Sequence, residues 1–291
     1  MHFVNAKGIL TARNGVHGMN IYRGCTHGCI YCDSRSLCYR MDHPFEDVEV
    51  KRNAPELLER ALRSRRKRCM IGTGAMSDPY VPCERELKLT RRCLELIRDY
   101  GFGATVLTKS DLVLRDADLF REINEGAKCV VQMTLTTLDD GLSAILEPGV
   151  CSTRRRVEVL EALREMGIPT MVWMTPLLPF LNDTEENVGA ILDACVRTGV
   201  KGIVCFDMGM TLREGDREYY YAALDRFFPG LKERYIRTYG DAYELPSPDS
   251  ARLTRLFRET CAAHGLLFRP EDCFAYLNEF PETWPEQLSL F

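Results

Sequence analysis

The chain has 291 residues, of which 45% are hydrophobic and 27% are charged, and its formal net charge is −4. These values are ordinary for a soluble globular protein with one α/β domain or two small ones, and they argue against a protein coated in nucleic acid. The sequence shows neither an apolar signal-peptide run at its start nor a span of about 20 apolar residues, so we expect a cytoplasmic protein with no membrane partner.

Apolar, β-branched runs alternate along the chain with amphipathic helical stretches. The expected strands are Met19–Tyr22, Cys69–Thr73, Ala104–Thr108, Cys129–Thr134, Thr170–Met174 and Gly202–Phe206. The expected helices are Glu56–Arg66, Leu87–Tyr100, Ala117–Glu125, Thr153–Met166, Glu185–Thr198 and Arg217–Phe227. Continuous apolar strands with helices between them are typical of repeated parallel βα units. Six such units predict an α/β fold, a partial (β/α)6 TIM-like barrel with its active site at the carboxyl ends of the strands.

The pattern changes after the last of these units, and the chain is expected to divide into four parts. These are an N-terminal segment at residues 1–17, the barrel at 18–232, a C-terminal helical extension at 233–280 and an extended tail at 281–291. The extension contains a helix pattern at Asp249–Ala263. Beyond that helix, three prolines indicate a proline-containing tail: Pro270, Pro281 and Pro285.

Three of the thirteen cysteines, Cys25, Cys29 and Cys32, form a C-x3-C-x2-C motif. Three thiolates at this spacing can hold three irons of a [4Fe–4S] cube and leave the fourth iron without a protein ligand. An open iron can bind a substrate or a cofactor, so the motif indicates a redox catalyst rather than a simple electron carrier. The other cysteines are scattered, and most are expected to be small buried hydrophobic residues in a reducing cell.

Two other kinds of metal site, zinc sites and bacterial ferredoxin clusters, are also built from closely spaced cysteines. A zinc site usually has a second pair of cysteine or histidine ligands at close spacing, and this chain has no such pair. A bacterial ferredoxin motif needs a fourth cysteine followed by proline, whereas Cys38 is followed by Tyr39. The [4Fe–4S] cluster is therefore the favoured interpretation, and zinc is the main alternative.

The loop after the second expected strand, from Gly72 to Glu84, is rich in small and polar residues. Small residues let the backbone approach a ligand closely, and Ser77 and Asp78 can accept hydrogen bonds from an ammonium group. A tight turn leading into a helix explains the same residues equally well. The residues alone leave both interpretations open.

Several motifs occur in an order that resembles one protein family. They are Asn20 to Cys25, Ser77-Asp78-Pro79-Tyr80, Leu107-Thr108-Lys109-Ser110, Glu147-Pro148-Gly149, Arg156, and Thr175-Pro176 through Asn182-Asp183. Over about residues 18 to 210, they resemble the spore photoproduct lyase-like branch of the radical S-adenosylmethionine (SAM) superfamily. The resemblance implies a [4Fe–4S] cluster on the three cysteines, with SAM chelated to the open iron. It also implies reductive cleavage of SAM to methionine and a 5′-deoxyadenosyl radical, with an electron donor such as flavodoxin or ferredoxin.

The same resemblance implies how SAM is bound. Ser77 and Asp78 would lie near its methionine amino group, and Lys109 near its carboxylate. The remaining implied contacts are Tyr31 with the adenine, Thr134 or Thr136 with the ribose, and Arg156 with an acidic residue or with the SAM carboxylate.

One departure from the family concerns a hydrogen donor. In the true photoproduct lyases a cysteine precedes the Ser-Asp pair, whereas this chain has Ala75 and Met76 before Ser77. Cys83, on the same loop, is the candidate replacement, because a thiolate at a helix entry is stabilised. The alternative is that Cys83 is an inert packing residue. The resemblance therefore implies radical chemistry without implying the lyase reaction itself.

The last five residues, Gln287-Leu288-Ser289-Leu290-Phe291, resemble a docking peptide. Bacterial DNA polymerases and repair proteins bind the β sliding clamp through a similar pentapeptide. Gln287, Leu288, Leu290 and Phe291 would make the contacts, because leucine and phenylalanine on an extended segment offer apolar anchors for a groove. The alternative is a tail that packs back over the barrel. Clamp binding would bring the chain to replicating or repaired DNA.

The leading functional hypothesis is a radical SAM enzyme that acts on DNA, by lesion repair or by base modification. A second hypothesis keeps the chemistry but changes the substrate to RNA, a peptide or a small metabolite. A third is a non-catalytic, clamp-bound iron–sulfur redox sensor. The basic residues between Arg60 and Arg68 are either a phosphate contact or the solvated end of a helix.

Overall fold

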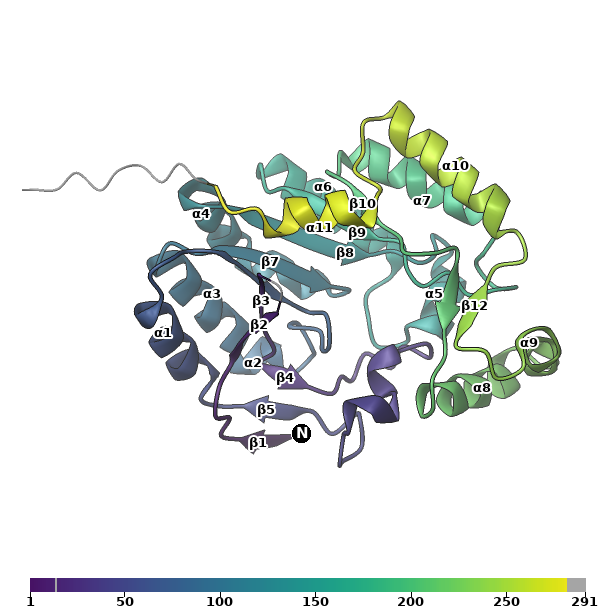
Figure 1. Cartoon of the computed structure of the whole chain (residues 1–291), viewed down its shortest axis with the longest axis horizontal. Coiled ribbons are helices and arrows are strands. Elements are labelled where there is room, and N and C mark those ends of the chain that lie inside the picture. The colour runs from purple at the N-terminus through teal and green to yellow at the C-terminus, as the bar shows by residue number, and fades with distance from the viewer. Residues whose placement is uncertain (14, 282–291) are drawn as a thin grey trace, which may run out of the picture.

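The computed structural model describes residues 1–13 and 15–281 of the chain. Its main sheet has seven strands in the order β10-β9-β8-β7-β6-β3-β2, and each neighbouring pair from β3 to β10 is parallel (Figure 1). The parallel strands are β3 (Val16–Met19), β6 (Met70–Thr73), β7 (Gly103–Thr108), β8 (Cys129–Thr134), β9 (Thr170–Trp173) and β10 (Ile203–Val204). Strand β2 (Leu10–Arg13) pairs antiparallel with β3 at one edge. The partial (β/α)6 barrel that the sequence predicts is confirmed.

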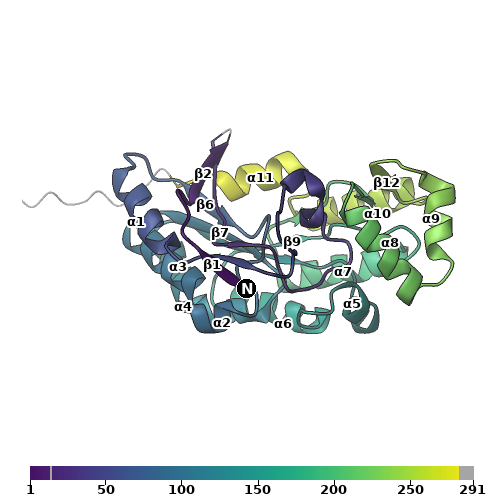
Figure 2. The same ribbon diagram turned by 90° about the horizontal axis from the view of Figure 1, so that it is seen from below.

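A layer of helices covers one face of this sheet, and the largest apolar core lies between them (Figure 2). The helices that follow the successive strands are α1 (Ala54–Ser64), α2 (Glu84–Leu87), α3 (Leu89–Asp99), α4 (Ala117–Gly126), α5 (Asp140–Leu146), α6 (Thr153–Glu165) and α7 (Glu185–Thr198). Helix α10 (Ser250–Ala263) packs against α7. Within the described part of the chain, no helix is both long and apolar enough to span a membrane.

The opposite face of the sheet is covered by α11 (Pro270–Asn278). Cys273 and Leu277 of this helix pack against side chains of three neighbouring strands: Val130, Met171 and Val204. The sequence analysis predicted a proline-containing tail here, and this prediction is wrong for Pro270. Proline is favourable in the first turn of a helix, because its missing N–H group would have no helical partner there.

The first expected strand, Met19–Tyr22, is in fact divided between two sheets. Strand β3 ends at Met19, and the residues that follow lead into a second, three-stranded sheet with the order β1-β5-β4. Its strands are β1 (His2–Val4), β5 (Glu49–Lys51) and β4 (Tyr22–Arg23). One apolar run thus serves two sheets, and apolarity alone does not reveal the change. The N-terminal segment 1–17 contributes strands to both sheets.

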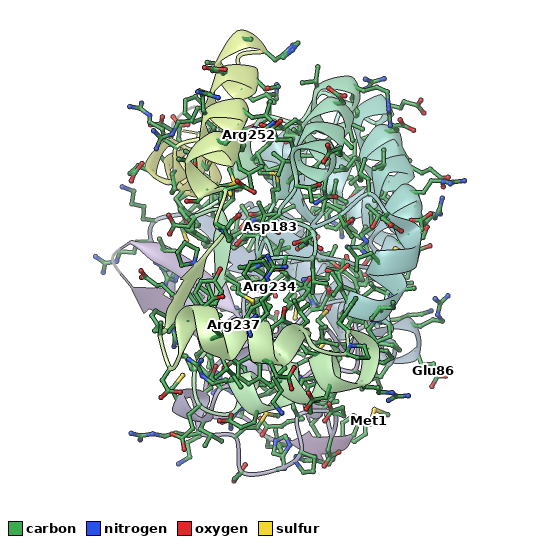
Figure 3. All side chains as sticks on the ribbon, turned by 90° about the vertical axis from the view of Figure 1, so that its right-hand side faces the viewer. Met1, Glu86, Asp183, Arg234, Arg237 and Arg252 are labelled. Carbon is green, nitrogen blue, oxygen red and sulfur yellow. The ribbon has the colours of Figure 1, made fainter. Side chains whose placement is uncertain are left out.

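A second apolar core lies beyond the barrel. It is built from α8 (Asp216–Phe227), α9 (Leu231–Tyr239) and the antiparallel pair β11 (Gly209–Thr211) and β12 (Glu244–Pro246). Ile30 and Tyr31, from the segment with the three cysteines, belong to the same core. The domain boundary expected at residue 232 therefore falls inside a packed unit. Figure 3 views this end of the molecule, with Arg234 near the centre, where its guanidinium lies 3.7 Å from the centre of the Phe180 ring.

Candidate functional site

A cavity of about 830 Å³ lies at the carboxyl ends of the parallel strands. This is where the active site of a β/α barrel is expected. Cys25, Cys29 and Cys32 line the same cavity. The strands contribute residues at or just after their ends, which are Ser77 and Asp78 after β6, Lys109 after β7, Thr134 in β8, Trp173 in β9 and Phe206 after β10.

The loop that carries the three cysteines follows β4. Cys25 and Cys29 are buried, and Cys32 is half-buried. Gly24 has a φ of +83°, and a Cβ atom at this position would collide with the carbonyl oxygen of Phe45. The same carbonyl accepts a hydrogen bond from the amide of Cys25 at 3.0 Å. Glycine alone permits this close approach, which fixes the position of the first thiol.

Two of the motifs in the other loops hold the cysteine loop in place. The Ser77 hydroxyl donates a hydrogen bond to the carbonyl of Gly24 at 2.5 Å. On the other side, the amide of Gly149 donates to the carbonyl of His27 at 2.8 Å. Both hydrogen bonds are to the backbone of the cysteine loop. Ser77 and Gly149 therefore fix the conformation of this loop, in addition to any contact with a cofactor.

The spacing of the three sulfurs helps to separate a cluster from a single ion. The ligands of one tetrahedral zinc ion, with Zn–S bonds of about 2.3 Å, lie about 3.8 Å apart. The sulfurs of Cys25, Cys29 and Cys32 do not all lie within 4.8 Å of one another. A cube, which places each thiolate on a different iron, needs the wider spacing. Three thiols, without a fourth cysteine among the described residues that line the cavity, leave one iron of such a cube open.

The charge balance beside the thiols also suits a metal cluster. Burial raises the pKa of all three thiols, to about 12 for Cys25. Metal binding must therefore release their protons. The Nζ atom of Lys109 lies 5.9 Å from the centre of the Tyr31 ring. Burial lowers the pKa of Lys109, but Cys29 and Glu147 raise it on balance, so Lys109 is a fixed positive charge beside the ligands.

Asp78 is surrounded by hydrogen-bond donors of the protein. Its Oδ1 accepts from the hydroxyl of Thr108 at 2.7 Å and from the amide of Tyr80 at 2.8 Å. Its Oδ2 accepts from the amide of Lys109 at 2.9 Å and lies 3.4 Å from Nδ1 of His27. The sequence implies that Asp78 lies near the amino group of SAM. Its contacts show that it also joins the loops after β6 and β7 to the cysteine loop.

Tyr31 is fixed by a buried ion pair. Its hydroxyl donates to one carboxylate oxygen of Glu147, and Arg156 donates to the other at 2.5 Å. Arg156 also donates to the carbonyl of Thr134 at 3.0 Å and to the hydroxyl of Ser143 at 2.9 Å. Of the two partners expected for Arg156, the acidic residue is the one observed. Arg156 lies behind the cavity wall and is not among the residues that line the cavity.

Two other expected site residues, Cys83 and Thr136, do not line the cavity. Cys83 precedes α2 and packs against the main core. Burial and the neighbouring Glu84 raise the pKa of its thiol, which is opposite to the effect expected of a helix entry. Helix α2 is only four residues long, and its N-terminus does not outweigh these effects. Thr136 is buried, and its carbonyl accepts hydrogen bonds from Asn182 and Asn187.

The remaining expected contacts lie elsewhere. Gln287, Leu288, Leu290 and Phe291 fall outside the residues that the structure describes. The basic residues from Arg60 to Arg68 surround the end of α1 and are not among the residues that line the cavity.

Aromatic residues that the sequence did not single out lie at the rim of the cavity. Phe206 is 51% exposed, and its ring stacks on Phe274 with 6.0 Å between the ring centres. Trp173 meets Phe206 edge-on at 5.7 Å. Phe206 and Trp173 line the cavity, and Phe274 packs behind them. We call these three residues the aromatic rim. Nearby in the cavity wall, Arg213 donates to the hydroxyl of Tyr243 at 2.6 Å. Trp173 and Phe206 fall within expected strands, whereas Phe274 had no signal in the sequence.

Sequence comparisons identify relatives of the chain. A profile of the Radical SAM superfamily matches residues 19–219, which is more than half of the chain. The uncharacterized protein MJ0683 of Methanocaldococcus jannaschii is 35% identical over 173 residues, covering 59% of this chain and 64% of that protein. The uncharacterized protein Mb2609c of Mycobacterium bovis is 30% identical over 236 residues, covering 78% of this chain and 68% of that protein. The chain thus spans slightly less than two thirds of the archaeal relative.

Solved structures of spore photoproduct lyase share the fold. A variant of that enzyme with one substitution has a TM-score of 0.68 at 14% identity, covering 91% of this chain and 80% of that chain. Its complex with a dinucleoside spore photoproduct has a TM-score of 0.67 at 14% identity, covering 92% and 82%. The profile match spans the cysteine loop and the parallel strands from β6 to β10. The chain therefore belongs to the radical SAM superfamily, whose members hold a [4Fe–4S] cluster on three cysteines and bind S-adenosylmethionine.

Proposed function

We propose that the chain is a radical SAM enzyme that acts on DNA, by repair of a lesion or by modification of a base. The observation that carries the proposal is the cavity, which brings the three cysteines together with an exposed aromatic rim. Ligand pockets run from about 300 to 1,000 Å³, so a cavity of about 830 Å³ has room for a cofactor and part of a second molecule. When bound, the cluster and SAM supply a 5′-deoxyadenosyl radical that takes a hydrogen atom from the substrate.

The residues around the cavity have distinct parts in this proposal. Cys25, Cys29 and Cys32 hold three irons. Lys109 balances the negative charge of the ligands and of the SAM carboxylate. Five residues that line the cavity are placed to bind SAM, namely Tyr31, Ser77, Asp78, Lys109 and Thr134. Thr136 and Arg156 act from behind the wall, where Arg156 positions Tyr31 through Glu147.

The aromatic rim supports a nucleobase as part of the substrate. Stacking of a base on an aromatic side chain contributes about 1–3 kcal/mol and works with any base. A second hollow of about 540 Å³ shares Phe206 and Asp207 with the main cavity and is lined by Arg258 and Arg269. A flipped base could enter the main cavity while its neighbours follow this second hollow. The dinucleoside bound by spore photoproduct lyase, which has the same fold, points to the same substrate class.

Two partners belong to the same proposal. The peptide Gln287–Phe291 would dock on the β sliding clamp, and a small electron-transfer protein such as flavodoxin or ferredoxin would reduce the cluster. Both rest on the sequence and the family, since the peptide lies outside the described residues.

The test uses the anaerobically reconstituted full chain with dithionite, SAM and an oligonucleotide deuterated in its thymine bases. One sample of this DNA is irradiated with ultraviolet light and another is not. We expect 5′-deoxyadenosine that contains deuterium from the irradiated DNA, detected by mass spectrometry. Replacing Cys29 with alanine should abolish both the absorbance of the cluster and the formation of 5′-deoxyadenosine, because a cluster ligand is lost.

Two substitutions of exposed phenylalanines test the rim. Phe206→Ala should weaken DNA binding roughly tenfold, within the range for loss of one stacked base, and leave SAM cleavage without DNA unchanged. Phe227→Ala is the matched control, because Phe227 is also exposed but lies outside the cavity. Formation of 5′-deoxyadenosine without deuterium from either DNA sample would reject thymine in DNA as the substrate and keep the chemistry. No 5′-deoxyadenosine at all would reject both.

A further inference from the structure

We propose that His2, His43 and Glu49 bind one Zn²⁺ ion, at a site in the small sheet that is separate from the cavity. One ligand atom of each residue lies within 4.8 Å of the ligand atoms of the other two. The cysteine sulfurs do not meet this condition, so the two places suit different metals. The site goes beyond the proposed function and does not depend on it.

The register of the small sheet brings the three side chains together. Strands β1 and β5 lie side by side in the small sheet (Figure 1). They are parallel, and their register makes His2 the direct partner of Glu49. Side chains at paired positions of neighbouring strands lie on the same face, only a few ångströms apart. His43 comes from the loop before β5, and its ring stands edge-on to that of His2 with 4.7 Å between the ring centres. Three segments of the chain thus converge on one point.

Both histidines are oriented as metal ligands usually are. Nδ1 of His43 lies 3.1 Å from the carbonyl oxygen of Pro44, which can only accept, so the lone pair is on Nε2. That Nε2 is buried and has no hydrogen-bond partner among the described residues. Nδ1 of His2 donates to the carboxylate of Asp47 at 2.9 Å, which likewise leaves its Nε2 with a lone pair. In metal sites the second ring nitrogen typically donates to a carbonyl or a carboxylate in this way.

The carboxylate of Glu49 is a mostly buried charge without a hydrogen bond. Its side chain is 16% exposed, and no hydrogen bond joins it to the residues that the structure describes. Lys51 interacts with it through charge, but the Lys51 ammonium donates to the carbonyl of Asn20, and Arg23 on the adjacent strand donates to other carbonyls. Burial of a carboxylate without hydrogen bonds is costly, and a cation between it and two imidazoles lowers that cost.

The ligand set and its spacing favour zinc. Two imidazole nitrogens and one carboxylate oxygen are common zinc ligands, with water in the fourth position. Bonds of about 2.0–2.1 Å place tetrahedral ligands about 3.3 Å apart. Nε2 of His43 lies 3.8 Å from Oε2 of Glu49, so a small movement of the side chains is enough.

The site would brace the cysteine loop from behind. The loop that carries His43 also carries Phe45, whose carbonyl accepts the hydrogen bond from the amide of Cys25. A zinc ion would fix this loop to β1 and β5 at once. Its effect should therefore be seen in the stability of the chain.

The experiment uses the full chain without a polyhistidine tag, reconstituted with its cluster so that the three cysteines are occupied. The protein is dialysed against zinc, and iron and zinc are measured separately by mass spectrometry. We expect one zinc per chain, a higher Tm with zinc, and nitrogen or oxygen ligands at about 2.0–2.1 Å with no sulfur at about 2.3 Å by X-ray absorption.

Three variants make the assignment specific. His43→Ala and Glu49→Gln should each lower the affinity for zinc by about tenfold or more, and should abolish the rise in Tm. His264→Ala, at an exposed histidine outside the site, should change neither. The absence of bound zinc, zinc with sulfur ligands, or equal zinc affinity in all three variants would each overturn the site. Circular dichroism of each variant confirms that it is folded before the comparison is made.

Discussion

At the scale of single residues, the ion pair between Glu147 and Arg156 has the largest consequence near the cavity. The side chains of Arg156 and Glu147 are 0% and 1% exposed. Burial would raise the pKa of Glu147, but Arg156 and Lys109 lower it, so the carboxylate remains ionised. Each buried charge costs several kcal/mol, which the partner and the surrounding hydrogen bonds offset. Removal of one partner should therefore be worse than removal of both.

Arg156→Met should lower the free energy of unfolding by about 3–5 kcal/mol, because the charge of Glu147 would be left buried without its partner. Arg155→Met is the matched control, since Arg155 is exposed and its surface ion pairs contribute at most about 1 kcal/mol. Urea unfolding under anaerobic conditions measures both. The double variant Arg156→Met with Glu147→Gln should lose less than Arg156→Met alone. Equal losses at positions 155 and 156 would contradict the importance of the buried pair.

At the scale of elements, α11 closes the face of the sheet that the other helices leave uncovered. A partial barrel leaves the inner face of its strands without a partner, and α11 covers part of that face at β8, β9 and β10. The side chains of β8 alternate accordingly, with Val131 in the core under the outer helices and Val130 under α11. The same alternation brings Thr134 to the cavity.

Leu277→Ala should destabilise the chain by about 2–5 kcal/mol, because Leu277 is buried in the core between α11 and the sheet. Glu271→Ala, at an exposed position of the same helix, should change stability by at most about 0.5 kcal/mol. Thermal and urea unfolding of the two variants make the comparison. If both variants were equally stable, α11 would not be part of the folded core.

At the scale of the whole molecule, the cavity lies where the two cores meet. Thr134 and Trp173 line it from the barrel, and Met210 and Leu245 line it from the second core. The proposed clamp-binding peptide is separate from the cavity in the sequence. Its loss should leave the cavity and its chemistry intact.

Deletion of residues 287–291 should abolish binding to the β sliding clamp and leave SAM cleavage unchanged, since the peptide supplies the apolar anchors. A finer test replaces Leu290 and Phe291 together with alanine, and uses Ser289→Ala as the matched control. Surface plasmon resonance against the purified clamp measures the binding. Clamp binding that survives the deletion would retire the peptide as the docking element.

The sequence alone was enough to predict the barrel and the cluster loop. Five of the six apolar runs correspond to strands of the parallel sheet, and the sixth, Met19–Tyr22, overlaps β3 only at Met19. Three cysteines at short spacing predicted the metal loop. The aromatic rim was not predictable, because Trp173, Phe206 and Phe274 are brought together only by folding. The same holds for His2 and Glu49, whose pairing depends on the register of short strands that carry little apolar signal.

Other differences between prediction and structure concern residue types that occur in more than one structural setting. Proline both ends and begins helices, so Pro270 gave no sign of α11. Cys83 precedes a helix, but that helix is short and burial outweighs it. Arg156 had two expected partners, and only the structure shows that it pairs with Glu147.

Ile30 and Tyr31 belong to the second core as well as to the loop that carries the metal ligands. Any shift of this loop would therefore be transmitted to α8 and α9, through the packing around Leu224 and Tyr235. Limited proteolysis of residues 216–239 with and without the cluster measures this coupling.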